Sequence, residues 1–75
     1  MKRYLDKTGS SGVIAYEIQK DGILVRFRNG GTYLYNQQRP GKQQVAQMKK
    51  LAEQGAGLST YISVHVREQY AAQVQ

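Results

Sequence analysis

The residues that could do the most chemistry in this chain are cationic and aromatic, and several lie close together near its middle. Arg26 and Arg28 come shortly before Tyr33 and Tyr35. Guanidinium groups bind phosphate oxygens, and tyrosine rings stack on unpaired bases. This combination is typical of proteins that bind single-stranded RNA. The residues expected to contact nucleic acid are Arg26, Arg28, Tyr33, Tyr35, Lys42, Lys49, Lys50 and Arg67.

The residue types that catalysis or metal binding requires are scarce. The chain has no cysteine and one histidine, and its five acidic residues are scattered. No serine has the sequence context of an activated nucleophile, and His65 lies among apolar residues, which fits packing better than base catalysis. The spacings of metal ligands and of nucleotide-binding glycine loops are also missing. We therefore expect no enzyme, no metal, no cofactor and no small-molecule substrate.

Length and charge narrow the class of protein. Seventy-five residues are enough for one small domain, and a chain without cysteine must stabilise that domain by packing alone. A net charge of +6 attracts polyanions, although the same charge also keeps a small protein in solution. Neither a membrane-spanning run nor an apolar signal segment is present. We expect a cytoplasmic protein that does not bind membranes.

The first half of the chain predicts three antiparallel strands. Apolar and polar residues alternate over 13–19 and over 23–28, at the strand period of two. Asp21-Gly22 and Asn29-Gly30-Gly31 supply the turns, and a third strand over 32–36 completes a meander. The side chains expected to face inward from the first two strands are Ile14, Tyr16, Ile18, Ile23, Val25 and Phe27.

The second half predicts two short α-helices, which makes the fold class α+β. Apolar residues recur at helical spacing over 42–54, after Pro40 in the first turn and before Gly55 as the stop. The last segment, with Ser59 as a possible N-cap, has apolar residues at 58, 62, 66 and 70. Its β-branched stretch also fits a strand, but the apolar set spans too long a run for one short strand, so we favour a helix.

These elements divide the chain into an arm, one domain and a tail. Residues 1–12 are polar and rich in Gly and Ser, which predicts a flexible N-terminal arm. The domain spans 13–72, and 73–75 form a frayed C-terminus. A three-stranded meander has edges that a second copy would cover, and the sequence leaves monomer and homodimer both open.

The length of the loop at Asn29 decides what the two central tyrosines do. A two-residue loop pairs Arg26 with Tyr33, so the tyrosines share a face with the arginines and form a stacking platform. A three-residue loop with a bulge sets Phe27 and Val25 opposite the tyrosines instead, and the rings then belong to the core. We favour the core alternative, because a chain of this size has few other large side chains.

Three sequence blocks resemble the KTSC family of short domains. They are Ser10-Ser11 with the strand ending at Tyr16, the Tyr33-Leu34-Tyr35 triplet after an apolar strand, and the closing block from Tyr61 to Tyr70. KTSC domains occur alone and at the C-terminus of some bacterial lysyl-tRNA synthetases. The resemblance implies a small domain of this size, and the synthetase fusion suggests RNA binding.

The sequence therefore predicts a non-enzymatic basic module whose partner is nucleic acid, with RNA favoured over DNA. The alternative is a protein–protein interaction module, such as a small adaptor or an inhibitor-like protein of a mobile element. Leu24 and Leu34, expected on the outward face of the sheet, and open sheet edges motivate that alternative.

Overall fold

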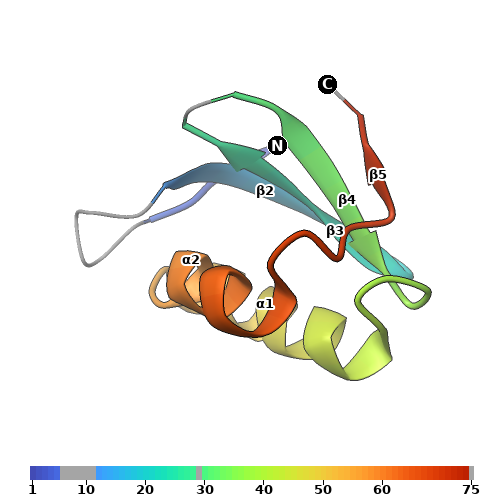
Figure 1. Ribbon diagram of the computed structural model, residues 1–75. Coiled ribbons are helices and arrows are strands. Elements are labelled where there is room, and N and C mark those ends of the chain that lie inside the picture. Colours follow the sequence, from blue (N-terminus) through green and yellow to red (C-terminus); the bar gives the residue numbers. More distant parts are fainter. Residues whose placement is uncertain (6–11, 29, 75) are drawn as a thin grey trace.

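The computed structural model describes residues 1–5, 12–28 and 30–74. One antiparallel sheet has its five strands in sequence order, and the helices cover one of its faces (Figure 1). The strands are β1 (Lys2–Arg3), β2 (Val13–Gln19), β3 (Gly22–Phe27), β4 (Thr32–Asn36) and β5 (Ala72–Gln73); the helices are α1 (Lys42–Gln54), α2 (Leu58–Tyr61) and the π-helix η1 (Ile62–Val66). The predicted α+β class is confirmed, but the sheet has five strands rather than three. Within the described ranges, no helix combines the length and apolarity needed to cross a membrane.

The two additional strands come from the ends of the chain. β1 pairs with β2, with Lys2 opposite Tyr16, and β5 pairs with β4, with Gln73 opposite Tyr33. The predicted arm over 1–12 is therefore wrong for residues 2–4, and the predicted frayed tail is wrong at Gln73. The rest of the predicted arm, at 6–11, lies outside the described residues. Short edge strands of this kind leave little backbone free for pairing with other chains.

Tyr4 explains why the N-terminal segment joins the fold. Its side chain is only 3% exposed, its ring lies 6.5 Å from that of Tyr16, and its hydroxyl accepts a hydrogen bond from the backbone N–H of Leu58 at 3.2 Å. A single buried aromatic side chain contributes about 1.5 to 3 kcal/mol of burial free energy. Residues 1–12 are polar on average, and for this reason the buried position of Tyr4 could not be predicted from their composition.

The register between β3 and β4 sets Val25 opposite Tyr33 and Ile23 opposite Tyr35. This register differs by two residues from the one predicted for a three-residue loop, and side chains alternate with a period of two, so the same faces result. The core alternative is confirmed for Tyr35, which is 2% exposed, while Tyr33 is half-buried. The hairpin closes one residue earlier than predicted, because the N–H of Phe27 donates to Gly31 O, at 3.1 Å.

A β-bulge in β2 changes which residue faces the core. The register with β3 shifts between Val13 and Ala15, so one extra residue, Ile14, stands in the strand. Val13 lies opposite Phe27 and is buried, whereas Ile14 is half-buried. The predicted inward position of Ile14 is corrected accordingly.

The helices follow the predicted order, but their starts differ, and the last segment ends at Val66 as a π-helix, before the Tyr70 that was expected on its face. α1 ends at Gly55, whose φ of 75° is the left-handed conformation that glycine adopts at helix ends, as predicted. Pro40 was expected in the first turn of α1. It precedes the helix instead, because Gly41 is the N-cap. The last segment is helical from Leu58 to Val66, and its N-cap is Gly57 instead of Ser59.

The core lies between the inner face of the sheet and the helices. The sheet contributes aromatic and β-branched side chains, and α1 contributes Val45, Met48 and Ala52. The whole buried apolar set is Tyr4, Val13, Tyr16, Ile23, Val25, Tyr35, Val45, Met48, Ala52, Leu58, Ile62 and Val66.

Replacing Tyr4 by Phe tests the anchoring of the N-terminal segment. The variant keeps the ring but leaves the buried N–H of Leu58 without its partner, so the free energy of unfolding should fall by about 1 to 2 kcal/mol in urea denaturation. Tyr61→Phe, at a half-buried helical position, is the matched control and should cost less than about 0.5 kcal/mol. Equal losses in the two variants would contradict an anchoring role for Tyr4.

Alkaline unfolding tests the burial of Tyr35. Burial raises the pKa of the Tyr35 hydroxyl well above its ordinary value of 10.0, and Tyr33 and Tyr70 raise it further. Above about pH 10 the folded state therefore keeps a proton that the unfolded state loses. The free energy of unfolding keeps its full value below about pH 10 and falls as the pH rises above it. We expect the urea midpoint to drop between about pH 9 and pH 11, less in Tyr35→Phe than in the wild type. A drop of the same size in Tyr35→Phe would show that Tyr35 does not contribute.

Candidate nucleic-acid interface

The helices leave one face of the sheet uncovered (Figure 1). The strand register places two arginines in one row of that open face. Arg3 lies opposite Ala15, Ala15 opposite Arg26, and Arg26 opposite Thr32. Residues paired across neighbouring strands share a face, so Arg3 and Arg26 both belong to this open face. They are two strands apart, roughly 10 Å at the usual strand spacing, and both are exposed.

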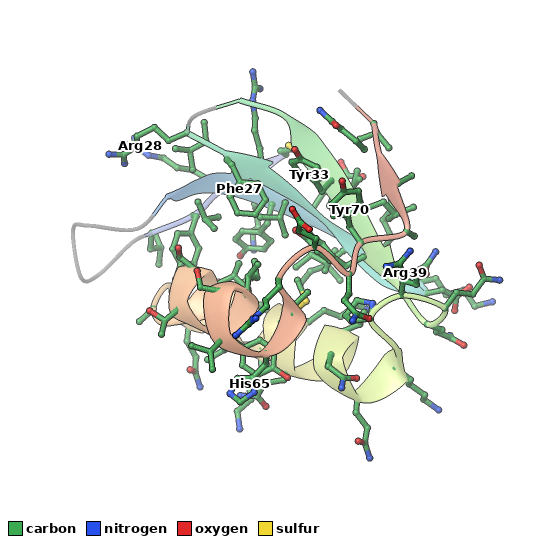
Figure 2. The ribbon with its side chains drawn as sticks, viewed as in Figure 1. Phe27, Arg28, Tyr33, Arg39, His65 and Tyr70 are labelled. Atoms are coloured by element: carbon green, nitrogen blue, oxygen red, sulfur yellow. The ribbon has the colours of Figure 1, made fainter. Side chains whose placement is uncertain are left out.

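A third arginine stands at the end of β3. Arg28 follows Arg26 by two residues, and with Arg3 it lines a hollow of about 260 Å³ whose other walls are Tyr4, Leu5, Val13 and Ile14. Figure 2 shows Arg28 at the hairpin end of the sheet, pointing away from the helices. None of the described residues that line this hollow is acidic. We call Arg3, Arg26 and Arg28 the arginine cluster.

The tyrosines predicted to accompany these arginines lie on the other face. The ring of Tyr33 is 5.6 Å from Phe27 and 4.6 Å from Tyr70, on the helix side of the sheet (Figure 2). Tyr35 also contacts Tyr70, at 6.4 Å, and its burial prevents it from stacking on a base. Among the described strand residues, the open-face positions hold no aromatic side chain. The stacking platform edged by cations, one of the two alternatives from the sequence, is therefore not formed.

The predicted lysines of α1 are separated from the arginine cluster as well. α1 packs on the inner face of the sheet, so Lys42, Lys49 and Lys50 lie on the helix side of the molecule. Lys42 and Lys49 line a hollow of about 160 Å³ together with Lys20, and we call this the lysine hollow. Lys50 is exposed and outside that hollow, and Arg67 is exposed after η1, with a φ of 53°.

Two cations of these surfaces were not predicted from the sequence. Arg3 fell within the supposed flexible arm, because a two-residue strand is too short to show an alternating pattern. Lys20 stands at the turn between β2 and β3, where a lysine is ordinary. The one available signal for Arg3 was its neighbour Tyr4, a large aromatic residue in an otherwise polar segment.

His65 does not occupy the packed position expected for it. It is exposed, its ring lies 4.8 Å from that of Tyr61, and it points away from the sheet (Figure 2). Glu17 and Glu53 line a separate hollow of about 520 Å³ that does not include His65. In the part of the chain that the structure describes, no group of three or more His, Cys, Asp or Glu residues is arranged to hold a metal ion.

Comparison with known proteins gives no match. No family model, no curated protein and no solved structure matches the chain. The resemblance to KTSC domains therefore stays a prediction from the three sequence blocks. The geometry of the open face and of the lysine hollow is what remains to indicate a function.

Proposed function

We propose that this chain is a non-enzymatic cytoplasmic module that binds nucleic acid, RNA in preference to DNA, through the arginine cluster. One observation carries the proposal: the strand register puts Arg3 and Arg26 in the same row of the uncovered face, and Arg28, just past the end of β3, lines a hollow with Arg3. Two guanidinium groups on the open face and a third beside Arg3 at the end of β3 form a surface that attracts phosphates.

The chemistry of the cluster fits phosphate oxygens. A guanidinium group donates two parallel hydrogen bonds to such oxygens and keeps its charge at any physiological pH. The nearest acidic position on the open face is Glu17, which pairs with Leu24 in the next row. Because the arginines outnumber this one carboxylate and the chain as a whole carries a net charge of +6, the surface keeps a positive excess.

The same face lacks the groups that recognise particular bases. With the tyrosines on the helix side, contacts on the open face are made to the phosphate backbone, which positions a ligand without reporting its sequence. We therefore propose weak sequence preference and strong dependence on salt. The preference for RNA draws on the resemblance to KTSC domains and their fusion to lysyl-tRNA synthetases. Monomer and homodimer both fit this mode of binding.

The proposal predicts how charge removal changes RNA binding. We expect labelled single-stranded RNA to bind saturably at about 50 mM salt and much more weakly at about 200 mM in fluorescence anisotropy. In the variant Arg3→Gln/Arg26→Gln/Arg28→Gln, the slope of log affinity against log salt should shrink by about 2, since each phosphate contact contributes about 0.7 for a single strand.

A second triple variant distinguishes the effect of the arginine cluster on RNA binding from the effect of net charge. Arg39→Gln/Lys50→Gln/Arg67→Gln removes the same charge from exposed positions outside the cluster, and it should reduce the slope by less than about 1. Equal losses in the two variants would assign binding to overall charge. Absence of saturable binding by the wild type at the lower salt would end the proposal.

Protein–protein interaction is the second candidate function, and one observation favours it. Leu24 lies directly opposite Leu34, and both are half-buried on the open face with Ala72 beside them. Half-exposed apolar side chains at the centre of an uncovered sheet face are a possible contact for another protein. Strand addition, the other motive for this candidate, has less support because β1 and β5 occupy part of each sheet edge.

The two candidates respond differently to Leu24→Ser/Leu34→Ser. If the open face binds phosphates through arginines, RNA affinity in the anisotropy assay should stay within about twofold of the wild type. If the face binds a protein, a partner captured from nuclease-treated lysate should be lost in this variant and kept in the arginine variant. Circular dichroism of each variant checks that the fold is intact.

A further inference from the structure

The lysine hollow lies where the turn between β2 and β3 meets the first half of α1. Lys20 and Asp21 come from the turn, and Lys42 and Lys49 come from one side of the helix. We propose that this hollow is an oxyanion site that takes a single phosphate group. It is separate from the arginine cluster, and its existence does not rest on the function proposed above.

Lys49 gives the hollow a fixed cation. Its ammonium group donates hydrogen bonds to the backbone carbonyls of Gln19, at 2.8 Å, and Lys20, at 3.3 Å. An ammonium group has three donors, so one N–H is left for a ligand. Because these two bonds already restrict the long side chain, binding costs less conformational entropy than it would with a freely moving lysine.

The charge inside the hollow favours an anion. Three lysines line it against one acidic residue, Asp21. One oxygen of its carboxylate accepts a hydrogen bond from the side-chain amide of Gln37, at 3.0 Å. Val45 and Ala46 also line the hollow. Their apolar side chains have no acceptor that would compete with an anion for the lysine N–H groups. Lys20 and Lys42 are exposed, so both can turn toward a bound ligand.

The size of the hollow suits a small ligand such as a phosphate group. Its volume is about 160 Å³. Pockets that enclose whole organic ligands measure about 300 to 1,000 Å³. A tetrahedral oxyanion fits the smaller space, whereas a base with its sugar would lie outside it.

The position of the hollow keeps it distinct from the arginine cluster. Gly22 and Phe27 stand at opposite ends of β3, which corresponds to about 17 Å of extended chain. The hollow lies beyond the Gly22 end, and Arg28 follows the Phe27 end. The phosphate group can be free inorganic phosphate or part of an RNA backbone, and the chemistry of recognition is the same for both.

Backbone amide shifts measured by NMR test the site. Inorganic phosphate added to ¹⁵N-labelled protein, with chloride at equal ionic strength as the reference, should give saturable shifts at residues 20–21 and 42–46. In Lys20→Gln/Lys42→Gln the apparent affinity should fall at least about fivefold. Lys50→Gln/Arg67→Gln removes equal charge from outside the hollow and should change it less than about twofold.

The outcomes decide whether the site exists and whether it binds phosphodiesters or free phosphate. Shifts at the hollow with a short RNA, with or without inorganic phosphate, assign the site to phosphodiesters. Shifts with inorganic phosphate alone assign it to free phosphate. Shifts that do not saturate, or equal effects in the two double variants, would overturn the site. Failure of the arginine cluster is seen separately, as RNA affinity that Arg3→Gln/Arg26→Gln/Arg28→Gln leaves unchanged.

Discussion

The pairing of β3 with β4 is the constraint on which the rest of this structure depends. With Val25 opposite Tyr33, every second residue of the two strands points into the core, and Arg26 points to the open face. A slip of one residue would exchange the faces, exposing Ile23 and Val25 and burying a guanidinium group without a partner. The cost of that exchange enforces the register. It also separates the arginines from the tyrosines, and so decides which of them can meet a ligand.

Scarcity of large side chains explains why the tyrosines belong to the core. The chain has no tryptophan, one phenylalanine and six tyrosines, so tyrosine rings must supply much of the buried area that a small domain needs. Tyr4, Tyr16 and Tyr35 are buried, and Tyr70 packs over the last of these. Tyrosine rings that could have stacked on bases are therefore packed in the core. The exposed cations remain for the contact with a partner that we propose. The lack of open-face aromatic side chains and the phosphate-based binding we propose have this common origin.

The sequence predicts the elements that bury one continuous face and misses those held by distant contacts. Alternation over 13–19 and 23–28 and helical spacing over 42–54 were sufficient, because each of these segments has one apolar side. β1 and β5 are too short to have a period, and β1 is fixed by Tyr4 through Leu58, 54 residues away. Arg26 and Arg28 were correctly expected to be exposed. Their separation from the α1 lysines was not predictable, because spacing within a strand does not specify which face the helices will cover.

The placement of the cations at both ends of the sheet determines how they can act together. At physiological salt, charges more than about 8 Å apart are largely screened from one another, and about 17 Å separates the two ends of β3. The arginine cluster and the lysine hollow therefore behave as independent points of contact. Their affinities combine only when one ligand reaches both, because the second contact then forms at a high effective concentration. In the binding mode we propose, a short oligonucleotide gains from one of them alone, whereas a long or folded RNA can use both. The proposal therefore makes affinity depend on the length of the ligand rather than on its sequence.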